Sequence, residues 1–138
     1  MAEMIKPGGM VIVEDADASA NFCHPPNEAF ALYVRLYREA MRVRGTDPDI
    51  GPRLPHLLKD AGFVGIGISI HQPAELSAGD VKLIVALTLD SVAEPAVAAG
   101  LATSDEVRTA SEQLHALAKA EDVVVSLPRI VQTWGSKA

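Results

Sequence analysis

Three carboxylates, Glu14, Asp15 and Asp17, follow the apolar run from Met10 to Val13. A short continuous apolar run favours a strand that is covered on both faces, as in a parallel sheet. Open α/β sheets bind their ligands at the carboxyl ends of such strands. These three residues are therefore the candidate catalytic residues, as an acid or base that faces a substrate. The alternative is that they are solvated carboxylates that cap or turn a loop.

Cys23 and His24 could suggest a thiolate–imidazole pair, but catalytic pairs usually meet through the fold. A buried thiol beside a loop histidine is the simpler interpretation. A metal site that adds Asp15 and Asp17 matches no common ligand spacing, so none is predicted. His24 stays a candidate substrate-binding residue, together with Arg53, which lies near a helix start where anions bind. The alternative for Arg53 is an ordinary surface arginine.

The composition is that of a globular protein. Of the 138 residues, 49% are hydrophobic and 22% are charged, which predicts one domain over residues 1–138. The net charge of −6 disfavours nucleic-acid binding through bulk charge. A local basic cluster is interpreted as a solvated helix face. It consists of Arg35, Arg38, Arg42 and Arg44.

A single cysteine, Cys23, excludes an intramolecular disulfide and favours a reducing, cytoplasmic location. No apolar run reaches the length of a membrane span, so no membrane partner is expected.

Periodicity and breaks predict about three strands and four to five helices in an α/β arrangement. Residues 28–44 read as a helix that Asn27 caps, with an apolar stripe of Phe30, Val34, Tyr37 and Met41. The other predicted helices cover residues 52–61, 78–99 and 103–120. Pro95 is expected to kink or divide the second of these, and a capping box at residues 103–106 begins the third. Strands are predicted at residues 10–13, 63–71 and after Pro128.

Three segments resemble landmarks of class I S-adenosylmethionine-dependent methyltransferases. Residues 5–15 (IKPGGMVIVED) resemble the segment that leads into the family's fifth strand. Residues 54–63 (LPHLLKDAGF) resemble the short helix before its sixth strand. Residues 127–135 resemble its seventh strand, which inserts antiparallel between the other two. The resemblance covers essentially the whole chain and implies the C-terminal half of a Rossmann-like fold.

The family's cofactor site requires a Gly-rich turn between a strand and a helix, and this chain offers none. Gly65 and Gly67 lie inside an alternating strand and are rejected as a nucleotide loop. The cofactor-binding half is therefore expected to be missing, with S-adenosylmethionine implied only for the complete fold. Residues 78–120 occupy the place where relatives often build the acceptor pocket. A helical cover or a dimer interface is preferred there.

The resemblance implies the acceptor-substrate side of a methyltransferase that does not methylate as an isolated chain. A partner is expected to complete the fold, either a second copy or a complementary methyltransferase half. A second copy would bind at the strand edge from Met10 to Val13, or on the apolar helices. Two alternatives stay open: a stand-alone dimeric interaction or small-ligand-binding module, and a small enzyme of unrelated chemistry at the carboxylates.

Overall fold

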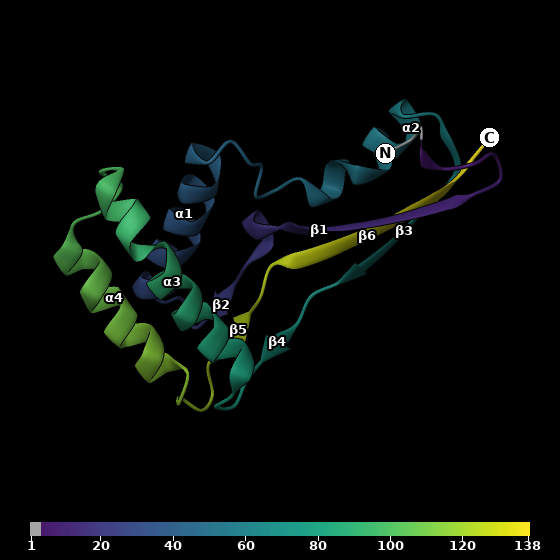
Figure 1. Ribbon diagram of the computed structural model, residues 1–138. Coiled ribbons are helices and arrows are strands. Elements are labelled where there is room, and N and C mark those ends of the chain that lie inside the picture. The colour runs from purple at the N-terminus through teal and green to yellow at the C-terminus, as the bar shows by residue number, and fades with distance from the viewer. Residues whose placement is uncertain (1–3) are drawn as a thin grey trace.

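The computed structural model describes residues 4–138, so the first three residues of the predicted domain lie outside it. Residues 4–138 form a mixed α/β structure, as predicted, with four α-helices and two three-stranded sheets. Figure 1 shows a long sheet that extends away from three gathered helices, α1, α3 and α4. The C-terminal end of the chain lies at the far end of the sheet, on the same side as α2.

The larger sheet contains β1 (Met10–Asp17), β3 (Phe63–His71) and β6 (Arg129–Lys137), in the order β1–β6–β3. The central strand β6 pairs antiparallel with both neighbours. The last strand thus lies between the other two, in the order that the resemblance implied. The apolar run at Met10–Val13 does not pair with a parallel neighbour as its composition favoured, because β1 and β3 run in the same direction but β6 separates them.

Strand β1 differs from its prediction in length and in burial. It continues to Asp17 because β6 keeps pairing with it as far as Arg129. It is not covered on both faces, since Met10 is 63% and Ile12 60% exposed whereas Val11 is buried. An alternating strand with one covered face is typical of antiparallel sheets.

Strand β3 has the predicted bounds, and Trp134 of β6 covers it at Gly67. A bulge lies between Val64 and Gly67, at Gly65, whose φ is +63°. The indole ring of Trp134 lies against Gly67, where a Cβ atom would overlap it. The glycine therefore accommodates an aromatic side chain of the neighbouring strand.

The smaller sheet was not predicted. It consists of β2 (Cys23–His24), β5 (Val124–Ser126) and β4 (Ala74–Glu75), in the order β2–β5–β4 and with antiparallel pairs. Strands of two or three residues leave almost no periodicity in the sequence. This sheet connects the large sheet to the helices, because β5 leads through two residues into β6 (Figure 1).

Helix α1 (Glu28–Val43) begins where Asn27 Oδ1 accepts a hydrogen bond of 2.9 Å from the Phe30 amide, as predicted. Its buried face differs from the predicted stripe. Only Phe30 of that stripe is buried, and the other buried residues are Ala29, Tyr33, Leu36 and Ala40. The helix is rotated in this way because α3 and α4 pack on that side.

A 3-10 turn, η3 (Gly51–Arg53), leads into α2 (Leu54–Asp60), which packs on the large sheet. Leu54 and Leu58 of α2 are buried, whereas Leu57 is exposed. The core beneath α2 is small and contains Val11, Leu58 and Phe63.

Helices α3 (Asp80–Ala98) and α4 (Ser104–Leu117) complete the layer of helices. Pro95 does not divide α3, because it lies in the last turn and removes only one backbone hydrogen bond. The capping box between Thr103 and Glu106 is confirmed. None of the helices formed by residues 4–138 combines the length and apolar composition that a membrane crossing requires.

Candidate functional site

The three predicted catalytic carboxylates do not converge on one site. They lie within β1 rather than after it, so Glu14 points to the opposite face from Asp15 and Asp17. Glu14 accepts a hydrogen bond of 3.0 Å from Gln132 Nε2 across the strand pair. Asp15 is exposed and accepts a hydrogen bond of 2.8 Å from the neighbouring Ala16 amide. Neither carboxylate borders a pocket described below.

Asp17 has a structural role at the end of β1. Its side chain is buried and accepts hydrogen bonds from the amide (3.2 Å) and the hydroxyl of Ser19, which caps the 3-10 turn η2 (Ala18–Ala20). Arg129 Nη1 lies 3.7 Å from Asp17 Oδ2. These contacts fix the direction in which the chain leaves the sheet.

The two predicted substrate-binding residues also stay apart. His24 is an exposed residue of β2, opposite Val124, and is joined to Pro25 by a cis peptide bond. Arg53 pairs with Asp47, with 2.9 Å between Nη1 and Oδ2, on the exposed surface. Arg53 thus agrees with the alternative interpretation of an ordinary surface arginine.

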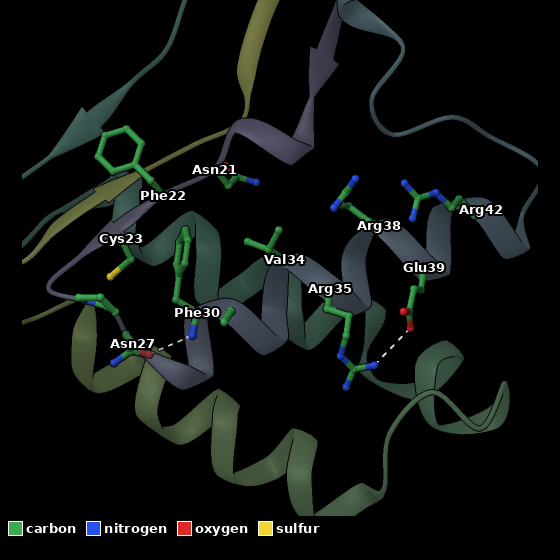
Figure 2. A pocket seen from close by; sticks show the side chains of 12 residues that line it. Asn21, Phe22, Cys23, Asn27, Phe30, Val34, Arg35, Arg38, Glu39 and Arg42 are labelled. Atoms are coloured by element: carbon green, nitrogen blue, oxygen red, sulfur yellow. Dashed lines mark hydrogen bonds and ion pairs between the residues drawn. The ribbon is translucent and has the colours of Figure 1, made fainter.

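A pocket with a volume of about 460 Å³ lies just beyond the carboxyl end of β1. We call it the loop–helix pocket, because residues 21–27 form one wall and α1 forms the other (Figure 2). Its volume falls in the usual range of small-ligand sites. The lining side chains are Asn21, Phe22, Cys23, Pro26, Asn27, Phe30, Ala31, Val34, Arg35, Arg38, Glu39 and Arg42.

One side of the loop–helix pocket is positively charged. Arg38 and Arg42 lie one turn apart on α1, and Figure 2 shows both on the same side of the helix as Asn21 and Phe22. Asp49 lies between them: Arg38 Nη2 and Arg42 Nη2 are 2.7 and 2.8 Å from its Oδ2. Burial alone would raise the pKa of Asp49, but the hydrogen bonds and charges of the two arginines outweigh it and lower that pKa. Asp49 is therefore ionised at neutral pH.

Arg35 and Glu39 form a separate pair on the other rim of the pocket. Arg35 Nη1 lies 3.2 Å from Glu39 Oε2 and also donates to the Leu101 carbonyl at 3.2 Å. Figure 2 shows both side chains directed away from Arg38 and Arg42. Because Glu39 pairs with Arg35, its carboxylate does not neutralise Arg38 or Arg42.

The opposite side of the pocket is apolar and contains a reduced thiol. Phe22 is 45% exposed, and Phe30 and Val34 line the pocket below it. Burial raises the pKa of the Cys23 thiol, against a smaller opposing effect of the Lys82 charge. A thiol with a raised pKa is protonated at neutral pH and is a weak nucleophile. Cys23 thus contributes to the apolar wall, and it pairs with no histidine.

Asn21 is the unusual polar residue of this pocket. Its side-chain oxygen and nitrogen are shielded from water and have no hydrogen-bond partner among residues 4–138. Each unsatisfied buried polar group costs about 1–3 kcal/mol. An ordered water or a bound ligand would supply the partners of such an amide.

Residues 4–138 contain no glycine-rich turn between a strand and a helix. Among the connections from a strand to a helix, residues 18–27 contain no glycine, and residues 72–79 contain only Gly79, packed against the Glu75 carboxylate. Gly67 is covered by Trp134 and cannot receive a ligand. The described residues also bring no three His, Cys, Asp or Glu side chains together for a metal ion.

The pocket was missed because its residues were interpreted separately. Arg38 and Arg42 belong to a basic cluster that reads as a solvated helix face, and the sequence around Asn21 and Phe22 predicts no site. Two features of the sequence could have indicated the pocket. Arg38 and Arg42 are four residues apart on one helix, and that helix directly follows a strand and a loop that contains an aromatic residue.

No protein-family model and no curated protein matches this chain.

Proposed function

We propose that this chain is the acceptor-substrate side of an S-adenosylmethionine-dependent methyltransferase, with a partial Rossmann-like fold. The observation that carries this proposal is the place of the loop–helix pocket, directly beyond the carboxyl end of β1. In mostly parallel α/β sheets, ligand sites lie at the carboxyl ends of the strands, and β1 and β3 both end on this side of the sheet. The order β1–β6–β3, with its antiparallel central strand, supports the same assignment.

In this proposal the chain holds the acceptor and leaves the cofactor to another polypeptide segment. Methyl transfer depends on aligning the acceptor atom with the activated methyl group, so a half that binds one reactant is inactive. The lack of a glycine-rich turn in residues 4–138 that could approach the cofactor supports this division. Enzymatic activity therefore belongs to a complex.

The free side of β1 is the proposed attachment point. Within the described sheet, β1 pairs only with β6, so its other edge offers unpaired backbone groups. The adjoining face carries the exposed Met10 and Ile12, with Trp134 opposite Ile12. A strand and helix supplied by a complementary half, or by a second copy, would pair with this edge and cover this face.

A second candidate function, a stand-alone dimeric interaction module, is favoured by one feature of α3. This helix is apolar on its outer side as well as its inner side, with exposed Leu83, Ile84 and Leu87. Contiguous apolar residues of this kind mark interaction surfaces. In that case the helices form the dimer, and no methyl transfer follows.

The first test is a calorimetric titration of the purified chain with S-adenosylmethionine. We expect no saturable binding, because residues 4–138 provide no cofactor loop. The second test adds a polypeptide with a glycine-rich strand–turn–helix segment, sought first in the coding sequence directly upstream. The pair is expected to bind S-adenosylmethionine and to transfer its methyl group.

Each measurement can contradict the proposal. Stoichiometric binding of S-adenosylmethionine by the isolated chain would mean that the chain has a cofactor site of its own. An active pair whose acceptor KM does not change in the variant Val34→Trp, which fills the loop–helix pocket, would mean that the acceptor binds elsewhere. Light scattering that shows a dimer with no activity in any pairing would favour the interaction module.

A further inference from the structure

The loop–helix pocket combines two arginines, an apolar wall and a buried amide without partners. We propose that it binds a small aromatic carboxylic acid, with the carboxylate on Arg38 and Arg42 and the ring against Phe22 and Val34. The binding site stands on the geometry of the pocket. Only the role of the acid as methyl acceptor rests on the proposed function.

The charge balance of the pocket selects an anion. Arg38 and Arg42 share the single carboxylate of Asp49, so this group of three side chains has a net charge of +1 (two positive minus one negative). The whole chain has a net charge of −6, which makes this site a local exception. A monoanion would neutralise it in a setting that is partly shielded from water.

The arginines have donors left for this anion. Asp49 accepts from Nε and Nη2 of Arg38 and from Nη2 of Arg42. No hydrogen bond within residues 4–138 uses the Nη1 atom of Arg38 or of Arg42. Planar guanidinium groups bind carboxylates through paired N–H donors. Two such groups, held in place by Asp49, form a preorganised carboxylate site.

The other side of the pocket selects an apolar, flat body. Phe22 presents an exposed ring, and Val34 lies between it and Arg38 along the wall (Figure 2). A volume of about 460 Å³ is far larger than a bare inorganic anion needs. Aromatic rings pack favourably against phenylalanine at such a surface. A free phosphate would leave this wall without a contact.

The Asn21 amide explains why a polar substituent on the ring is expected. Figure 2 shows Asn21 on the pocket side that Phe22, Arg38 and Arg42 share. Its amide has one acceptor and two donor positions, and neither atom has a partner among residues 4–138. A hydroxyl group on the ligand donates and accepts hydrogen bonds at once, and satisfies this amide after a small rotation of its side chain.

The experiment titrates the ¹⁵N-labelled full chain with three probes and follows the amide shifts of residues 21–42. The probes are 6-hydroxy-2-naphthoate, its neutral alcohol analogue 6-hydroxy-2-naphthalenemethanol, and inorganic phosphate. We expect saturable shifts around Asn21, Val34 and Arg38 with the carboxylate. The alcohol should bind at least about tenfold more weakly, because it lacks the charge-assisted hydrogen bonds. Phosphate should bind more weakly than the carboxylate, because it has no apolar body.

Variants separate the parts of the site. Arg42→Met should weaken carboxylate binding at least about tenfold and leave alcohol binding unchanged. Val34→Trp should block both aromatic probes without touching an arginine. Arg108→Met is the matched control, because Arg108 is an exposed arginine of α4 that pairs only with Asp105 and Glu112 among residues 4–138. Thermal melts of each variant confirm that it is folded.

Equal binding of the carboxylate and the alcohol, no saturable binding of the carboxylate, or equal losses in Arg42→Met and Arg108→Met would each overturn the proposal. Its failure is distinguishable from failure of the proposed function. If the carboxylate binds as expected but no pairing with a cofactor half transfers a methyl group, the site stands and the methyltransferase assignment falls. If a pairing is active while the carboxylate does not bind, only the ligand assignment falls.

Discussion

Helices α1, α3 and α4 bury their side chains against one another, whereas the sheet β1–β6–β3 leaves much of its surface to solvent. The helical region has a continuous core that includes Leu36, Leu89 and Leu114, all fully buried. The core of the sheet region consists of Val11, Leu58 and Phe63. Several large apolar side chains of the sheet remain more than half exposed. They are Met10, Ile12, Val64, Ile68 and Ile70.

This difference shows which region has a closed core of its own. Apolar area removed from water contributes about 25 cal/mol per Å², so a closed core stabilises the helical region by itself. The sheet has one short helix, α2, against part of one face, and two unpaired edges in the described residues. Natural sheets usually cover or pair such surfaces. The comparison therefore locates the expected partner on the sheet and the ligand pocket at its junction with α1.

The largest expected effect comes from opening the helical core. Leu89→Ala removes a fully buried side chain of α3 and should lower the free energy of unfolding by about 2–5 kcal/mol. Leu87→Ala, two residues earlier on the exposed side of the same helix, should change it by about 0.5 kcal/mol or less. Urea unfolding measures both variants.

The same experiment asks whether the two regions unfold together. Far-ultraviolet circular dichroism reports mainly the helices, and the fluorescence of Trp134, the single tryptophan, reports the sheet. Coincident transitions in Leu89→Ala would mean one cooperative unit. A helical transition that moves alone would mean that the sheet region is stable without the helices, and would contradict the view that the helical core stabilises the chain.

The next effect concerns the most closely packed point of the sheet. Gly67→Ala places a Cβ atom where the Trp134 indole lies, and overpacking of this kind costs about 1–3 kcal/mol. The Trp134 fluorescence should change as the ring moves. Ser69→Ala, on the same face of β3 and opposite Gln132, is the control. If both variants have the wild-type emission and stability, the ring does not lie against Gly67.

Local patterns predicted those elements whose signals are local. The alternation of residues 63–71 gave β3 its full length, and the capping box at Thr103 and Glu106 fixed the start of α4. Pro128 marked the start of the last strand correctly, since β6 begins at Arg129. Each of these signals acts within a few residues of the chain.

Features that depend on distant neighbours were not predictable in this way. The apolar residues of α1 allow two adjacent buried faces, and only the packing of α3 and α4 selects Tyr33 and Leu36 over Val34. The length of β1 depends on pairing with β6, more than a hundred residues away. The candidate site depends on distant neighbours too, since Asn21 and Arg42 line one pocket only when the loop folds back over the helix.

Acid should weaken a contact within the helical region and a contact at its junction with the sheet. The contacts are those of Asp90 and Asp49, and burial alone would raise the pKa of both carboxyls. Hydrogen bonds from Ser111 and His115 lower the pKa of Asp90 below the ordinary 3.8. A hydrogen bond from Arg38 does the same for Asp49. A carboxyl whose pKa is lowered by folding stabilises the folded state above its ordinary pKa. That contribution is lost as the pH falls through the lowered value.

The slope of unfolding free energy between about pH 5 and pH 3 tests this pair of contacts. Asp90→Asn and Asp49→Asn should each flatten the slope, because each removes a carboxyl whose pKa is lowered by folding. Gln113→Ala, an exposed and uncharged position of α4, is the control. A slope that is unchanged in both aspartate variants would show that neither contact forms in solution.

The smallest effect on the isolated chain, and the most informative one, is expected on the uncovered face of β1. Val11→Ala removes two buried methyl groups on the covered face and should lower the free energy of unfolding by about 1.5 kcal/mol. Ile12→Thr, at the neighbouring exposed position, should lower it by about 0.5 kcal/mol or less. This contrast holds for a monomer. If a second copy covers the face, the unfolding midpoint of the wild type rises with protein concentration, and Ile12→Thr removes that dependence. A midpoint independent of concentration, with monomers in light scattering, would exclude self-association and leave a complementary half as the remaining proposed partner for this face.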